Sequence, residues 1–220
     1  MATLDIELRT FIDRLRGYFM NVDVDLVLFT VRDGRLLVLL RSGDGAKSLP
    51  GSPVGDGEPV EEAARRVLRA QGIRGAYVEQ LYTFGDPGRV PGDRSLSVAY
   101  FALLRSAPEG ATWKPVKSLP PLAFDHALII RTALARLRAK LSYSTVGLQL
   151  LPRAFTLTEL QELYEVILAR RLDKRNFRRK ILATGLLRPV SGRLAAGAHR
   201  PAQLYAFRTR KIRILDGQIV

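Results

Sequence analysis

Positive charge in this chain of 220 residues is concentrated in its second part. Residues 124–220 contain 19 lysines and arginines against 6 aspartates and glutamates, whereas residues 1–123 contain 16 against 15. Charge that served solubility alone would not be segregated so sharply, so we expect a nearly neutral module followed by a basic module that binds a polyanion. A nucleic acid is the expected partner rather than a membrane surface, because the basic part does not form one amphipathic helix with an aromatic-rich apolar face.

The residue content narrows the class of protein further. The sequence contains no cysteine, which excludes a disulfide framework and a thiolate metal site and fits the cytoplasmic location that we expect. The first residues include Asp5, Glu7 and Asp13 and lack the continuous apolar segment of a signal peptide. No later stretch is apolar over a length that spans a bilayer.

The first part of the sequence has the order of elements of an α+β domain. Apolar residues at helical spacing predict an N-terminal helix within residues 1–19. Residues 20–121 are expected to form a mixed sheet with flanking helices, and Asp33-Gly34 is typical of a hairpin turn. The predicted elements are strands over 24–31 and 35–40, a helix over 59–71, and strands over 77–83 and 96–104. The proline-bearing stretch 114–121 is interpreted as the connector at the domain boundary.

The second part begins with a predicted linking helix over residues 122–144. Residues 145–208 follow with the pattern helix, turn, helix and two short strands, which is typical of a winged helix-turn-helix DNA-binding domain, and 209–220 form a C-terminal tail. Thr156 with Glu159 is a capping-box signal, and Asp173 is a favourable N-cap for the second helix.

Residues 49–73 resemble the Nudix box, in which helix glutamates hold Mg²⁺ or Mn²⁺ for pyrophosphate hydrolysis. Glu58 follows Gly57, and Arg66 stands at the arginine position seven residues later; this pair is either a remnant of the motif or a coincidence of spacing. The departures are Ser52 for the leading glycine and the residues at the metal-binding glutamates, which are Val67, Ala70 and Gln71. Because these side chains supply no carboxylate, we predict no catalytic residues, no metal site, no cofactor and no hydrolase activity.

Several further segments, taken in their order along the chain, are similar to the sequences of one protein family. They are residues 79–87, which read Glu-Gln-Leu-Tyr-Thr-Phe-Gly-Asp-Pro, then Arg94 with 97–100, then 124–126, 155–161 and 172–180. In this order, over residues 20–208, the chain resembles the Nudix-related transcriptional regulators of the NrtR family. The resemblance implies a homodimeric repressor or activator, a degenerate Nudix domain that senses ADP-ribose, and control of NAD metabolism genes. Other branches of that family respond to sugars and control sugar catabolism.

The candidate site residues fall into two groups. Those expected to bind a nucleotide-like effector are Arg41, Tyr82, Phe84 and Arg94, although core packing explains the two aromatic residues equally well. Those expected to bind DNA are Thr156, Thr158, Lys174, Arg175, Asn176, Arg178, Arg179, Lys180, Arg193, His199 and Arg200. Arg175, Arg179 and Asn176 are the expected base contacts, and Lys174, Arg178 and Lys180 the expected phosphate contacts.

The sequence therefore predicts a DNA-binding repressor, acting on a palindromic double-stranded operator, whose affinity is controlled by a small nucleotide-like ligand such as ADP-ribose. The alternatives are a regulator that senses a sugar or sugar phosphate, an ADP-ribose pyrophosphohydrolase, which the missing glutamates disfavour, and an RNA-binding or nonspecific architectural protein.

Overall fold

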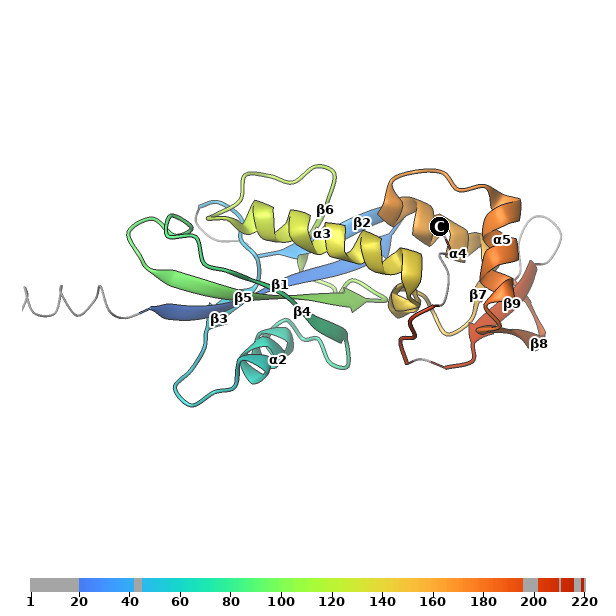
Figure 1. The fold of residues 1–220 in the computed structure, drawn as a ribbon, viewed down its shortest axis with the longest axis horizontal. Coiled ribbons are helices and arrows are strands. Elements are labelled where there is room, and N and C mark those ends of the chain that lie inside the picture. The colour runs from blue at the N-terminus through green and yellow to red at the C-terminus, as the bar shows by residue number, and fades with distance from the viewer. Residues whose placement is uncertain (1–19, 42–44, 196–201, 210, 216–218, 220) are drawn as a thin grey trace, which may run out of the picture.

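The structure, a computed structural model, describes residues 20–41, 45–195, 202–209, 211–215 and 219, with only the backbone described for 191–195 (Figure 1). The N-terminal helix predicted within residues 1–19 lies outside this part of the chain. The elements of the described part are β1 (Asn21–Arg32), β2 (Arg35–Leu40), β3 (Gly51–Pro53), α2 (Val60–Ala70), β4 (Tyr77–Phe84), β5 (Ser95–Leu104), β6 (Thr112–Pro115), α3 (His126–Tyr143), a 3₁₀ helix η1 (Val146–Leu150), β7 (Phe155–Thr156), α4 (Leu157–Leu168), α5 (Lys174–Ala183), β8 (Leu187–Ala195) and β9 (Ala202–Phe207). None of the helices described has the length and apolar content needed to cross a bilayer.

The first domain is built on a mixed sheet in the order β4-β5-β1-β2-β6, with β3 paired to β1. Strand β1 runs parallel to β5 through ten residue pairs and antiparallel to β2. The β1–β2 turn has positive φ at both Asp33 (51°) and Gly34 (66°), as a type I′ hairpin requires. The predicted Asp-Gly hairpin is thus confirmed.

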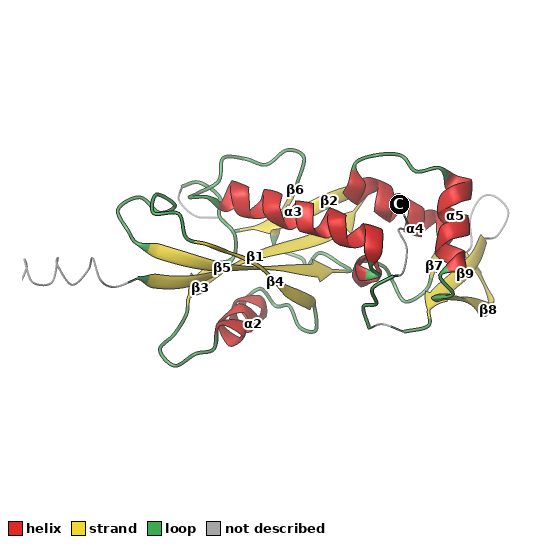
Figure 2. Ribbon diagram, viewed as in Figure 1, coloured by secondary structure: helices red, strands yellow, loops and turns green. Residues whose placement is uncertain are grey.

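Alternating residues of β1 pack against different helices, because successive side chains of a strand point to opposite faces. Val24, Leu26 and Leu28 share a core cluster with the buried residues of α2, whereas Val27 and Phe29 share one with the buried residues of α3. The sheet therefore lies between α2 and α3 (Figures 1 and 2). This is the mixed α+β architecture that the sequence predicted.

Two strands differ from the sequence prediction. The sequence predicted no strand between residues 40 and 59, yet residues 51–53 form β3 against β1. Residues 112–115 form β6 at the edge of the sheet, so the stretch 114–121 begins with a strand and is not wholly a connector. Proline is compatible with an edge strand, where one side of the backbone needs no ladder partner.

The winged-helix part contains α4, α5 and a second sheet in the order β7-β9-β8. Phe155, Leu160, Tyr164 and Phe177 belong to the same core cluster as Leu137 of α3. The linking helix and the winged helix thus share one continuous apolar core, which limits independent motion of the two.

The tail after β9 returns to the end of α3. The Thr145 amide donates to the Arg213 carbonyl at 3.0 Å, and the Leu215 amide donates to the Tyr143 carbonyl at 2.8 Å. Ile219 is buried within the core cluster that contains α3 and η1. The last described residues therefore contact the junction between the linking helix and the winged helix.

Candidate nucleic-acid interface and effector site

Helix α5 has one buried side and one polar side. Asp173 caps its start by accepting a hydrogen bond from the Asn176 amide at 2.7 Å, as the sequence predicted. Phe177 and Ile181 are buried, and the ring of Phe177 packs against that of Tyr164 in α4 at 5.2 Å between centroids. The apolar side thereby fixes α5 on α4 and determines which residues face outward.

The residues on the outward side of α5 are exposed and cationic. Lys174, Arg175, Asn176 and Arg179 all lie on the surface. Arg179 donates to the Asn176 side-chain oxygen at 2.8 Å. The two side chains, both predicted to contact bases, are therefore hydrogen-bonded to each other. The side chain of Arg175 forms no ion pair or hydrogen bond with another described residue, and it is therefore available to a ligand outside the protein.

Arg178 and Lys180 are half-buried, in contrast to these residues. Arg178 donates from Nη2 to the Thr158 hydroxyl at 2.9 Å, and its buried Nε has no acceptor among the described residues. This guanidinium joins α5 to the first turn of α4. A buried N–H without an acceptor is uncommon in folded proteins, so Arg178 retains hydrogen-bonding capacity at this junction.

Thr156 was predicted to contact DNA, and in the structure it caps the start of α4. Its side chain is buried, and its hydroxyl accepts from the Glu159 amide at 3.1 Å while the Glu159 carboxylate accepts from the Thr156 amide. This is the capping box that the sequence predicted. The Thr156 hydroxyl therefore stabilises the first turn of α4.

Replacement of Thr156 by alanine removes this cap, and we expect it to lower the free energy of unfolding by about 1 kcal/mol. The measurement is a urea unfolding curve followed by circular dichroism. Thr132→Ala is the matched control: among the described residues its hydroxyl donates only to the Leu128 carbonyl within α3, so that variant is expected to be neutral. Equal losses in the two variants would contradict the role of the cap.

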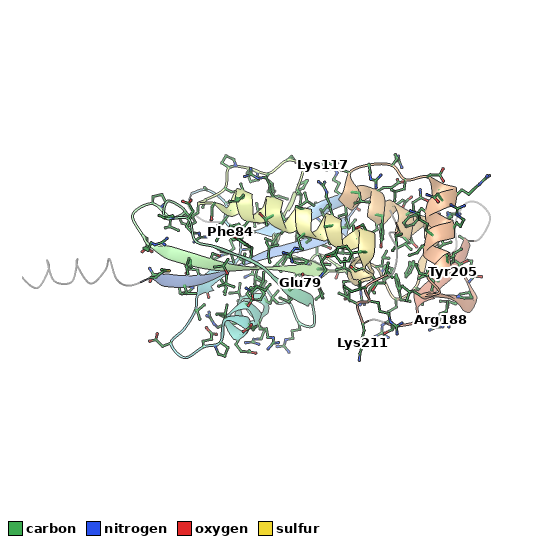
Figure 3. All side chains as sticks on the ribbon, in the orientation of Figure 1. Glu79, Phe84, Lys117, Arg188, Tyr205 and Lys211 are labelled. Carbon is green, nitrogen blue, oxygen red and sulfur yellow. The ribbon has the colours of Figure 1, made fainter. Side chains whose placement is uncertain are left out.

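The wing consists of β8 and β9, which lie beside α5 at the end of the molecule remote from β3 (Figure 1). Arg188 of β8 is exposed at this end, where Figure 3 labels it with Tyr205. Arg193 lies in β8, within the segment of which only the backbone is described, and His199 and Arg200 lie outside the described residues. Their contribution to DNA binding stays a prediction.

The predicted effector residues come from three strands and their loops. Arg41 donates to the Gly51 carbonyl at 3.2 Å, and Arg94 donates to the Gly85 carbonyl at 3.0 Å. Tyr82 is 61% exposed, whereas Phe84 is 7% exposed and belongs to the core. Phe84 thus contributes to the core, and its contact with an effector stays a prediction. Among the described residues, no hydrogen bond joins Arg41 to Tyr82 or Arg94.

Glu58 and Arg66 form a bidentate ion pair, so their spacing is not a coincidence. Arg66 donates to the Glu58 carboxylate from Nε at 2.9 Å and from Nη2 at 2.7 Å. It also donates to the Ser52 hydroxyl and to the Pro53 carbonyl, each at 2.9 Å. The hydrogen bonds from Arg66 lower the pKa of Glu58 to about 2. Serine at the leading glycine position therefore adds an acceptor that joins β3 to α2.

A buried ionic cluster lies on the other face of the sheet, and its members were not predicted as a site. Arg89, which is 6% exposed, donates to both carboxylate oxygens of Asp125 at 3.1 and 2.9 Å and to the Ser95 hydroxyl at 2.9 Å. Its Nη2 also lies 3.5 Å from Asp25. Arg89 belongs to the β4–β5 connection, which thereby contacts the residue that precedes α3.

Asp25 is the centre of this cluster. It accepts from the Ser97 hydroxyl at 2.6 Å and lies 3.5 Å from Nε2 of His126, whose Nδ1 accepts from the Leu49 amide at 2.9 Å. Burial raises the pKa of Asp25 and lowers the pKa of His126. A Cβ on Gly51 would lie 2.4 Å from the Asp25 carboxylate, so only glycine lets β3 approach here. His126 thus joins the start of α3 to the segment before β3.

A sheet domain with a Nudix-type fold joined to a winged helix defines a class of proteins in which one domain senses and the other binds DNA. The family model of the NrtR DNA-binding winged helix domain matches residues 147–207. The ADPR responsive transcriptional repressor NtrR of Acinetobacter baylyi is 37% identical over 202 residues, which span 84% of this chain and 80% of that protein. This chain belongs to the NrtR family.

Solved structures agree with this assignment. Shewanella oneidensis NrtR matches with a TM-score of 0.77 and 33% identity over 90% of this chain and 99% of that one. The same protein in complex with a 27mer DNA matches with a TM-score of 0.73 and 34% identity over 85% of this chain and 93% of that one. A MutT/nudix family protein from Enterococcus faecalis, 24% identical with a TM-score of 0.64 over 87% of this chain and 89% of that one, shares the fold.

Proposed function

We propose that this protein is a transcriptional repressor that binds an operator through α5 and the wing and responds to ADP-ribose bound by its Nudix-type domain. The observation that carries the proposal is the exposed cationic side of α5. Phe177 and Ile181, on the opposite side of this helix, are buried in the core and fix its orientation. A helix of this kind fits the major groove of double-stranded DNA, where arginine pairs with guanine and with phosphate. The DNA complex of Shewanella oneidensis NrtR supports this use of the fold.

ADP-ribose is proposed as the effector because the Acinetobacter baylyi relative is an ADPR responsive repressor. We propose that Arg41 and Arg94 bind its pyrophosphate and that the exposed ring of Tyr82 stacks on its base. Such a protein would control genes of NAD or cofactor metabolism. We further propose a homodimer on a palindromic operator, because two winged helices related by a two-fold axis read two equivalent half-sites.

The Nudix-type domain is proposed to have no hydrolase activity. Val67, at a metal-binding glutamate position, is buried against the sheet in the core cluster of α2. Glu58 remains, but its carboxylate is held by Arg66 and by the Gly55 amide. Since catalysis by two or more hard cations needs several carboxylates at once, one occupied carboxylate does not provide the site.

Communication between the two domains is proposed to follow α3. The Arg89–Asp125 ion pair fixes the β4–β5 connection, next to Arg94, to the start of this helix. In its second half, Arg138 donates to the Ile167 carbonyl in the last turn of α4 at 2.7 Å. We propose that the β4–β5 connection can take two positions, one that favours DNA binding and one that does not. A ligand that binds one position more tightly than the other would displace α4 and, with it, α5.

The proposal is tested by recovering bound DNA genome-wide and measuring operator affinity with and without ADP-ribose. We expect tight, salt-sensitive binding to a palindromic duplex and a change in affinity of about 5- to 150-fold at saturating ADP-ribose. The same incubations with Mg²⁺ should release no AMP. Equal affinity for all duplexes would contradict the operator, and AMP release that Glu58→Gln abolishes would contradict the absence of catalysis.

A further inference from the structure

A cavity of about 940 Å³ lies between the two domains and contains none of the proposed effector residues. The β1–β2 turn and the end of β6 form one wall, α3 forms the second, and the last turns of α4 form the third. Small-molecule sites occur preferentially at domain interfaces and have volumes of about 300–1,000 Å³, so this cavity has the place and the size of a ligand site.

The inner surface of the cavity is apolar. Leu36 is buried, and Val116, Leu134 and Val166 are partly buried and pack against the main core cluster. These side chains come from β2, the segment after β6, α3 and α4 respectively. They offer a planar or apolar group a surface that is shared by both domains.

The rim of the cavity carries cations that have no anionic partner in the part of the chain that the structure describes. The side chains of Arg35, Lys117 and Arg170 are exposed and form no ion pair with any described residue. Figure 3 labels Lys117 on the side of the molecule where α4 approaches the sheet domain. Three cations that line one opening favour an anion, because their mutual repulsion decreases when a phosphate binds between them.

The other charged residues of the lining do not cancel this excess. Glu165 accepts hydrogen bonds from Arg171 at 2.8 Å, from the Leu172 amide at 2.9 Å and from Gln161 at 2.9 Å, and the bond from the Leu172 amide is the main cause of its lowered pKa. Its charge is therefore already compensated. Glu162 is exposed, and among the described residues that line the cavity it is the one carboxylate that remains to oppose the three cations.

We propose that this interdomain cavity is a second ligand site, which binds a phosphorylated small molecule of nucleotide size. The apolar or planar part of the ligand packs against Leu36, Val116 and Val166, and its phosphates bind Arg35, Lys117 and Arg170. The proposal does not depend on the identity of the effector. Because the ligand contacts the sheet domain and α4 together, its affinity depends on their relative position, and it therefore influences DNA binding.

The test is a fluorescence titration of the full chain with the N-methylanthraniloyl derivative of ATP, which combines a phosphate chain with a planar apolar group. Lys117→Glu and Arg170→Glu are each expected to weaken binding about tenfold or more, since each replaces a charge-assisted hydrogen bond by repulsion. Val166→Trp fills the cavity and is expected to abolish binding. Arg74→Glu, which reverses an exposed cation outside the cavity, is the matched control and should bind as the original chain does.

Thermal unfolding checks that Val166→Trp still folds, and the two exposed charge reversals remain decisive if it does not. Inorganic tripolyphosphate should compete at least tenfold more weakly than the nucleotide, because it lacks the apolar part. Binding that all three variants leave unchanged, or that Arg74→Glu weakens as much as Lys117→Glu does, would overturn the site. Loss of ADP-ribose binding in Arg94→Ala, with nucleotide binding retained, would establish two separate sites.

Discussion

Replacement of Asp125 by alanine is expected to destabilise the folded protein by about 3–5 kcal/mol, as measured by urea unfolding. The guanidinium of Arg89 is 3% exposed, and Asp125 accepts two of its hydrogen bonds. Without this carboxylate, the buried cation keeps only Ser95 and the more distant Asp25 as partners. The loss is large because a buried charge that loses its partner has already lost its hydration.

A double-mutant cycle separates this coupling from simple loss of a side chain. Arg89→Met removes the cation, and the combined Arg89→Met and Asp125→Ala variant should lose less stability than the sum of the two single variants. Asp93→Ala is the matched control: among the described residues the Asp93 carboxylate accepts only from the exposed side-chain amide of Asn21, so its loss should cost less than about 1 kcal/mol. A loss below 1 kcal/mol in Asp125→Ala would show that the Arg89 ion pair does not hold α3 to the β4–β5 connection.

Replacement of Arg175 by alanine is expected to reduce discrimination between the operator and single-base variants by about 1–3 kcal/mol, which is about 5- to 150-fold in relative affinity. Arg175 is the base-contact candidate of first choice, because it is exposed and has no partner among the described residues, whereas the side chain of Arg179 donates to Asn176. The measurement is competitive binding of duplexes that differ at one position.

Lys174→Ala is the comparison that distinguishes base from phosphate contacts. Loss of a phosphate contact should weaken all duplexes to a similar extent and reduce the slope of log affinity against log salt concentration by about 1. If Arg175→Ala behaves in the same way as Lys174→Ala, Arg175 binds the DNA backbone and the operator is read by other residues.

Local signals predicted the elements of this protein well. The Asp33-Gly34 turn, the Thr156 cap and the Asp173 cap each depend on a few neighbouring residues, and the structure confirms all three. Phe177 and Ile181 are four residues apart, which places them on one side of a helix, and both are buried. Periodicity and capping are properties of consecutive residues, so a single sequence contains them.

Features that depend on distant residues were missed or misplaced. The short strand β3 was not predicted, because Gly51 and Ser52 favour a loop unless β1 is beside them. Phe84 was a candidate ligand contact, and its burial follows from packing within the core beneath α3. Asp125 lies in the segment 124–126 and Arg89 two residues after the segment 79–87, but nothing in the sequence indicated that the two side chains meet across 36 residues.

The uneven charge of the chain by itself determined that a basic module follows a nearly neutral one, and the substitutions in the Nudix box determined which carboxylates are missing. Both are properties of residue identity alone. Only the tertiary structure decided where those charges lie: Arg175 on an open surface, Arg89 in a buried cluster, and Lys117 with Arg170 at one cavity between the domains. The physical reason is that burial and pairing of a charge depend on which distant segments the folded core brings together.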